Sequence, residues 1–65
     1  MPQEYTVQPG DTFQKIAERF FGSENTDENA QKIFQANQNV GGVGNTVNDL
    51  NYEHNGNNVV ITIPD

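Results

Sequence analysis

The sequence predicts a single α+β domain in which two helices cover one face of a two-stranded sheet. Short stretches that alternate apolar and polar residues, typical of strands, stand near the two ends of the chain. Between them, apolar residues recur twice at the i, i+3, i+4, i+7 spacing of an amphipathic helix. A chain of 65 residues can bury one thin core, and a two-stranded sheet is marginal without helices packed on it.

The first strand is expected at Tyr5–Val7, where the alternation is short but regular. Pro9–Gly10 should end it, because proline fixes its own φ and glycine tolerates a positive φ in a turn. The first helix then needs a capping residue, and either Asp11 or Thr12 can supply it. Gln14 stands three residues after Asp11, which is the spacing of a capping box.

Each of the two predicted helices carries one apolar stripe. Gly22 is expected to end the first helix. Thr26 is expected to cap the second, and Asp27 and Glu28 place negative charge at the positive end of its dipole. The stripe consists of Phe13, Ile16, Ala17 and Phe20 in the first helix, and of Ala30, Ile33, Phe34 and Asn37 in the second.

The stretch from Gln38 to Asn58 is rich in glycine and asparagine, and we predict it to be a long loop. Only Val40, Val43, Val47, Leu50 and Tyr52 offer side chains that could attach this loop to a core. The last strand is expected at Val59–Ile63, and Pro64 ends it. Its alternation places Val59, Ile61 and Ile63 on one face.

The composition excludes several classes of function. The net charge is −6, and the only cations are Lys15, Arg19 and Lys32, too few to bind nucleic acid. The same charge would be repelled by an anionic membrane. There is no cysteine for a disulfide or a thiolate metal site, no stretch apolar enough to span a bilayer, and no signal peptide at Met1–Gln8. The charge favours a neutral ligand, or a partner that is not recognised by electrostatics.

These motifs, in this order and at these distances, resemble the LysM domain. The resemblance covers about Tyr5 to Pro64 and implies a βααβ fold, with two antiparallel strands packed against the helix pair. The stretches that carry it are Tyr5–Phe13 for the opening strand and turn, Ile16–Ala17 and Phe20–Gly22 for the first helix and its exit, Ile33, Ala36 and Asn37 for the end of the second helix, and Ile61–Pro64 for the closing strand.

The resemblance also implies a function. LysM domains are non-catalytic modules that bind polymers containing N-acetylglucosamine, chiefly peptidoglycan and chitin, in a shallow groove between two loops. We therefore expect no enzyme activity and no cofactor. By position, the first side of the groove would be Gly10, Asp11, Thr12 and Phe13, here called the first binding segment. The second side would be Asn48, Asp49, Leu50, Asn51 and Tyr52, the second binding segment.

Residues 1–65 would form one such domain, with a motif core at about 5–64, monomeric in isolation and part of a larger protein held at a cell wall or outside the cell. The residue types suit a neutral sugar, which offers an amide, hydroxyls and a methyl group. A turn at a helix start exposes backbone groups that lack a helical partner. Leu50 could contact the acetamido methyl, and Tyr52 could stack on a pyranose face.

Two departures from the family pattern leave an alternative open. The family often has a Pro-Gly-Gln turn before the last strand, where this chain has Asn57–Val59, and the preceding loop is longer than usual. The alternative is a protein–protein assembly module whose glycan groove has degenerated. A glycosidase is not expected, because most carboxylates have simpler positions on helix first turns or exposed faces. His54 lacks companion metal ligands and should be solvated, and Asn37 should tie the second helix to the loop.

Overall fold

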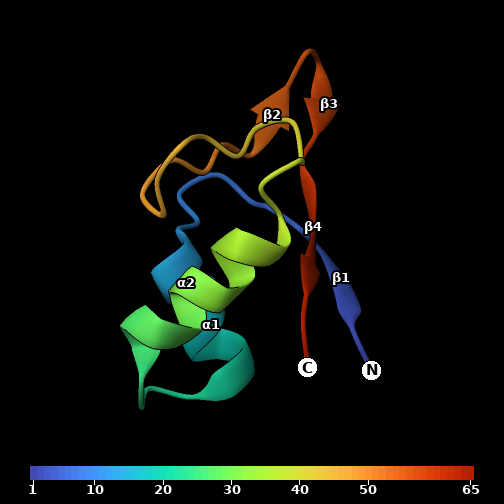
Figure 1. The fold of residues 1–65 in the computed structure, drawn as a ribbon. Helices are drawn as coiled ribbons and strands as arrows, with labels where there is room; N and C mark the ends of the chain where they lie inside the picture. Colours follow the sequence, from blue (N-terminus) through green and yellow to red (C-terminus); the bar gives the residue numbers. More distant parts are fainter.

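The computed structural model describes all residues from Met1 to Asp65 and has the predicted βααβ arrangement. An antiparallel pair of strands lies along one side, two helices pack together on the other, and a small hairpin stands beyond them at the upper end (Figure 1). The elements are β1 (Gln3–Thr6), α1 (Phe13–Phe21), α2 (Thr26–Ala36), β2 (Glu53–His54), β3 (Asn57–Asn58) and β4 (Val60–Ile63).

The first and last strands form the main sheet. The register pairs Gln3 with Ile63 and Thr6 with Val60, and the N–H of Val7 extends the ladder by donating to the carbonyl of Val59 at 2.9 Å. β1 therefore begins two residues earlier than predicted, while the pairing itself continues to the predicted end. Because the strands are antiparallel, the two chain ends lie side by side at the lower end of the sheet (Figure 1).

The core lies between the helices and one face of this sheet. Both predicted helix stripes point into it, except that Phe20 is only half-buried and packs edge-on against Tyr5, with 5.6 Å between ring centres. Phe13 and Phe34 make a second edge-to-face contact, at 5.8 Å, which joins α1 to α2. The buried apolar residues are Val7, Phe13, Ile16, Ala17, Ala30, Ile33, Phe34, Val59, Ile61 and Ile63.

The start of α1 differs from the prediction in detail. Thr12 is the capping residue: its backbone is extended, and its hydroxyl accepts a hydrogen bond from the N–H of Lys15 at 3.1 Å. Asp11 does not cap the helix, and the capping box between Asp11 and Gln14 does not form, because the carboxylate of Asp11 faces the preceding turn. Gly22 ends α1 as predicted, with a φ of 87°.

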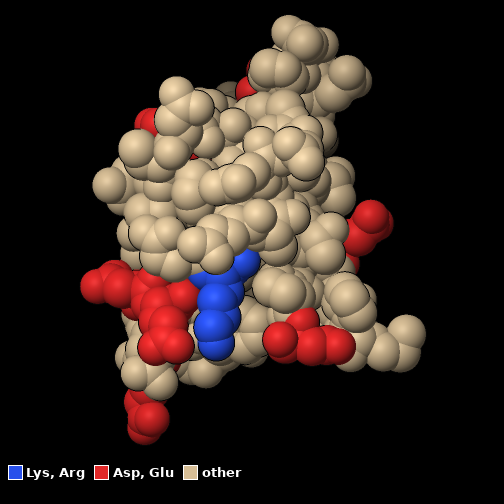
Figure 2. All heavy atoms as spheres, viewed as in Figure 1, with Lys and Arg blue, Asp and Glu red and all other residues tan.

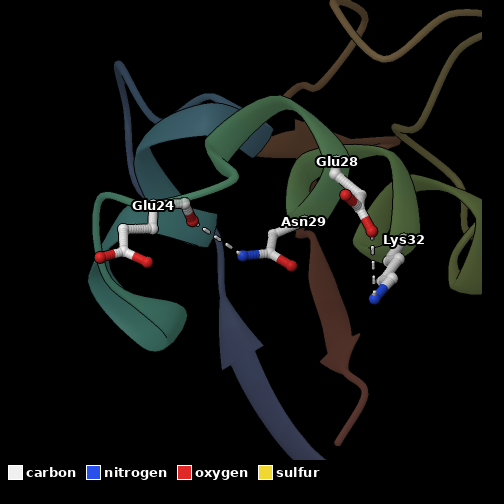
Figure 3. Close-up of polar contacts among 4 residues, drawn as sticks. All are labelled: Glu24, Glu28, Asn29 and Lys32. Carbon is white, nitrogen blue, oxygen red and sulfur yellow. Dashed lines mark hydrogen bonds and ion pairs between the residues drawn. The ribbon is translucent and has the colours of Figure 1, made fainter.

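The start of α2 was also predicted wrongly. Thr26 is the first helical residue, and its hydroxyl donates back to the carbonyl of Ser23 at 3.2 Å. The cap position belongs to Asn25, which takes the left-handed conformation that asparagine tolerates and makes no side-chain cap bond. Figure 3 shows the nearby polar contacts: Asn29 donates to the carbonyl of Glu24, and Glu28 faces Lys32 one turn along the exposed surface.

A fully buried amide joins the end of α2 to β4. The amide nitrogen of Asn37 donates to the carbonyls of Ile33 (2.7 Å) and Thr62 (2.8 Å), and its oxygen accepts from the N–H of Thr62 at 2.8 Å. The backbone of Val59 points toward β1, as its hydrogen bond with Val7 shows. Backbone groups alternate between the two edges of a strand, so the N–H and carbonyl of Thr62 point to the edge away from β1. Asn37 thus takes the place of a neighbouring strand, and it ties the helix to the sheet where we had predicted a tie to the loop.

The long connection from α2 to β4 contains structure that the sequence analysis missed. Glu53–His54 and Asn57–Asn58 pair as a β-hairpin around Asn55 and Gly56, whose φ angles of 52° and 82° are those of a type I′ turn. The rest of the connection is a series of tight turns, with an isolated bridge between Val43 and Leu50. Of the predicted anchors, Val40, Val43, Val47 and Leu50 pack against the core, and Tyr52 is exposed.

We predict that Asn37→Asp lowers the free energy of unfolding by about 3 kcal/mol or more, because the isosteric carboxylate cannot donate to the two buried carbonyls. Chemical denaturation of both proteins at neutral pH measures this loss. Asn39→Asp is the matched control, since it adds the same charge two residues away at an exposed side chain without hydrogen bonds. Equal losses in the two variants would contradict the role assigned to Asn37.

Candidate ligand-binding site

The first binding segment starts in a tight turn from Gln8 to Asp11. The N–H of Asp11 donates to the carbonyl of Gln8 at 3.0 Å, and the Asp11 carboxylate accepts from the N–H of Gln8 at 2.8 Å. Pro9 and Gly10 occupy the central positions, and the φ of 87° at Gly10 is what a type II turn requires. Asp11 therefore closes the turn that precedes the helix, and this is why it is unavailable as the helix cap.

The same carboxylate is attached to the sheet through Tyr5. The hydroxyl of Tyr5 donates to Asp11 Oδ2 at 2.5 Å, and Arg19 lies beside the phenol, with its guanidinium carbon 5.9 Å from the ring centre. The hydrogen bond to Asp11 is the main cause of a raised pKa at Tyr5, with burial and the negative charge of Asp11 adding to it and Arg19 opposing it. The turn is thus fixed to β1 at one end and to α1 at the other.

The start of α1 leaves three backbone donors free. The N–H groups of Thr12, Phe13 and Gln14 have no hydrogen-bond partner within the protein, as expected at the first turn of a helix. Thr12 is exposed, and its hydroxyl still has a proton to donate because it only accepts from Lys15. Phe13 is completely buried, backbone included, so only Thr12 and Gln14 can present their free N–H groups at the surface.

The second binding segment begins in a turn held by Thr46 and Asp49. The N–H of Asp49 donates to the carbonyl of Thr46 at 2.9 Å, and the N–H of Asn48 lies 3.3 Å from the Thr46 hydroxyl. The carbonyl of Asp49 accepts from the N–H of Gly44 at 2.8 Å. A side chain at Gly44 would have its Cβ 2.4 Å from that of Asp49, so this close approach needs glycine.

The remaining residues of the segment are held in different ways. Leu50 is half-buried and bridges to Val43, as expected for a residue that anchors the loop. Asn51 donates to the carbonyl of Gly42 through both its backbone (2.9 Å) and its side-chain nitrogen (3.1 Å), which leaves its side-chain oxygen free. Tyr52 has 43% of its surface exposed, so its ring is accessible.

One hydrogen bond joins the second binding segment to Gln14, the residue that directly follows the first. The side-chain nitrogen of Gln14, in the first turn of α1, donates to the side-chain oxygen of Asn48 at 3.4 Å. The structure therefore brings the two segments together at this point, whereas Asp49, Asn51 and Tyr52 make no hydrogen bond to the first segment. Gln14 was missing from the predicted site because its spacing had suggested a capping role. No pocket lies between the segments, so any ligand would rest on an open surface.

Charge divides the molecule into two ends. Of its three cations and nine acidic residues, only Asp49 and Glu53 fall between Gln38 and Asn58. Figure 2 shows the result on the face drawn: the charged side chains gather over the lower half, and the upper half is almost free of them. We call the upper part, residues 8–12 and 38–58, the loop end. Its hydrogen-bonding groups are mainly uncharged.

No three side chains of His, Cys, Asp or Glu lie close enough together to hold a metal ion, and His54 is exposed. Neither helix has the length and apolar character needed to cross a membrane.

The fold defines a small βααβ domain whose loop end carries no cation and few carboxylates. The family model for the LysM domain matches residues 5–48, which is more than half of the chain. The chain belongs to the LysM domain family. Comparison with curated proteins and with solved structures gives no match. LysM domains are in general non-catalytic modules that bind polymers containing N-acetylglucosamine, and they typically occur in extracellular or cell-wall proteins.

The matched region has a definite end within the site. It includes the first binding segment and stops at Asn48, so Asp49–Tyr52, the β2–β3 hairpin and β4 lie beyond it. The resemblance seen in the sequence extended to Pro64, and for this last part the support comes from the pairing of β4 with β1.

We predict that the folded domain becomes less stable as the pH rises above about 10, the ordinary pKa of tyrosine. The unfolded chain then releases the Tyr5 proton while the folded chain, with its raised pKa, retains it, so unfolding is increasingly favoured. Below that pH this contribution to stability is fully present. Denaturation at a series of pH values should show the decline in a Tyr52→Phe background, in which Tyr5 is the only tyrosine.

Phenolate absorbance in that background gives the titration directly. Replacing Asp11 by alanine should bring the pKa of Tyr5 back toward the ordinary tyrosine value, because the hydrogen bond that mainly raises it is removed. If Tyr5 ionises at or below the ordinary tyrosine pKa in the folded protein that still has Asp11, the Tyr5–Asp11 hydrogen bond is ruled out.

Proposed function

We propose that this domain binds N-acetylglucosamine-containing glycans, either peptidoglycan or chitin oligomers, on the surface between its two binding segments. The observation that carries the proposal is the hydrogen bond between Gln14 and Asn48, which joins the second binding segment to the helix turn that directly follows the first. A sugar lying across this contact can reach free groups on both sides.

The free groups suit an acetamido sugar. The backbone N–H groups of Thr12 and Gln14 can donate to the carbonyl of the acetamide. The Asn48 side-chain nitrogen and the Asn51 side-chain oxygen are free to donate to and accept from hydroxyls. Leu50 offers a small apolar contact for the methyl group, and the exposed ring of Tyr52 can stack on a sugar face. No ion pair is needed, in agreement with a loop end whose hydrogen-bonding groups are mainly uncharged.

An open surface without a pocket implies weak binding by one domain. Useful attachment then comes from several domains or from a ligand that repeats its binding unit, because the second contact is made at a high effective concentration. We therefore propose that residues 1–65 act as one module that anchors or targets a larger protein to a cell wall or another extracellular glycan.

We predict that chitin oligomers, or a soluble peptidoglycan fragment, shift the NMR signals of Gly10–Gln14 and Asn48–Tyr52 in the labelled domain, with shifts that grow with oligomer length. The two ligands presented separately distinguish the source of the sugar. No response at about 1 mM sugar, where a ligand worth roughly 4 kcal/mol would half-saturate the site, would refute glycan binding.

Asn48→Ala should weaken this binding about two- to tenfold, the range expected for one lost hydrogen bond. Asn48 is a cleaner probe than Asp11, because the side chain of Asp11 holds the preceding turn. The backbone N–H of Asn48 bonds to Thr46 and does not depend on the Asn48 side chain. Gln35→Ala is the matched control, because it removes an exposed amide without hydrogen bonds from α2. Equal affinities for the two variants would place the ligand elsewhere.

A second candidate is an assembly module that binds another protein, and the absence of a pocket at the loop end is the observation in its favour. It predicts no response to any glycan and a self-association or partner complex that sedimentation can detect.

A further inference from the structure

The β2–β3 hairpin is an unusual part of this domain. All of Tyr52–Asn58 is exposed, so the hairpin contributes no side chain to the core. It lies outside the region matched by the family model, and it projects from the loop end (Figure 1). An isolated two-stranded hairpin is marginally stable in water, so its persistence here needs a specific cause.

Two features hold the hairpin in place. Its turn is Asn55–Gly56, the pair that best fits the two positive φ angles of a type I′ turn. Its base rests on Gly41 and Gly42: a Cβ at the first would lie 2.6 Å from the ring of His54, and a Cβ at the second 2.5 Å from the side chain of Val59. Two of the glycines that had suggested a loop, Gly41 and Gly42, therefore leave the space that the base of the hairpin occupies.

Val59 fixes the hairpin relative to the binding segments. Its N–H donates to the carbonyl of Tyr52, and its carbonyl accepts from the N–H of Val7, both at 2.9 Å. The N–H and the carbonyl of a strand residue point to the same edge of the strand. Tyr52, at the base of the hairpin, and Val7, next to β1, therefore lie one after the other along the same edge of the strand that continues into β4. The hairpin therefore begins where the second binding segment ends, next to the residue that leads into the first.

The exposed chemistry of the hairpin matches a neutral sugar polymer. Asn55, Asn57 and Asn58 present amides that both donate and accept hydrogen bonds, and Glu53 carries its only carboxylate. Asn58 is paired with Glu53, and the strand alternation places it on the same face as the exposed Val60. Amides with a small apolar neighbour are the groups that hydroxyls, acetamides and sugar C–H surfaces can use.

We propose that the hairpin is a second arm of the glycan surface, which contacts sugar units beyond those held between the binding segments and so makes the domain select long N-acetylglucosamine polymers over short ones. This inference rests on the proposed glycan function and adds the residues that determine its length preference. The arm acts only on a ligand that already occupies the binding segments and is long enough to reach the β2–β3 hairpin.

The test is calorimetric or NMR titration of the whole domain with short and long oligomers, both of chitin and of soluble peptidoglycan. The double variant Asn57→Ala/Asn58→Ala should bind long oligomers about five- to tenfold more weakly and the shortest bound oligomer unchanged. The double variant Gln31→Ala/Gln35→Ala removes two exposed amides from α2 and should leave both affinities unchanged. Unaltered NMR signals of β1 and β4 show that the fold is intact.

The outcomes separate the two proposals. An equal loss for short and long oligomers would show that the hairpin merely supports the second binding segment, and it would overturn the arm. An unchanged affinity for long oligomers would overturn it as well. If the unmodified domain binds no oligomer of either length, the glycan function itself fails, and the arm falls with it.

Discussion

A two-stranded sheet has an open edge on each strand, and in this domain the edge of β4 is occupied by the buried amide of Asn37. An asparagine side chain has the same donor and acceptor as a peptide group, so it can replace a third strand at one residue. The third bond, to the carbonyl of Ile33, holds the amide in position on its own helix. Sheet, helix pair and the start of the long connection all meet at this residue, whose carbonyl also accepts from the N–H of Val40.

The loop end is built on this frame with little apolar material. Val40, Val43, Val47 and Leu50 attach the connection to the core, and backbone hydrogen bonds with closely fitting glycines do the rest. Loops of this kind can be both polar and ordered, and such loops on a rigid scaffold are where proteins place their binding groups. The charged residues lie mostly on the helices and near the chain ends, and the loop end has only Asp11, Asp49 and Glu53.

The helices and the last strand could be predicted because their apolar residues repeat with a clear period. The caps could be predicted only in part: Gly22 and one of the two candidates at the first helix, Thr12, are caps, but Asn25 replaces Thr26 at the second. Asp11 bonds instead to Gln8 and Tyr5, and the contact with Tyr5 depends on the tertiary structure. The hairpin did have a signal, Asn55–Gly56, but its flanking residues are all polar, so the apolar alternation that usually accompanies such a turn is missing.

The candidate site was predictable in part for similar reasons. Both binding segments were placed by resemblance, and the structure supports their proximity only through Gln14 and Asn48, which are 34 residues apart in the sequence. No local pattern can identify such a pair. The complete burial of Phe13 follows from the helix stripe, whereas the contact between Gly41 and His54 depends on a fold of the connection that propensity does not describe.

The antiparallel pairing of β1 with β4 has a consequence for how the domain can be connected. Because Gln3 lies opposite Ile63, both ends of the chain emerge from one place, at the opposite end of the sheet from the hairpin (Figure 1). Closing a host chain across so short a gap costs little conformational entropy, so the module can be spliced into a surface loop of another domain as readily as it can be fused at one end. In either arrangement the tether leaves the loop end unobstructed and pointing outward.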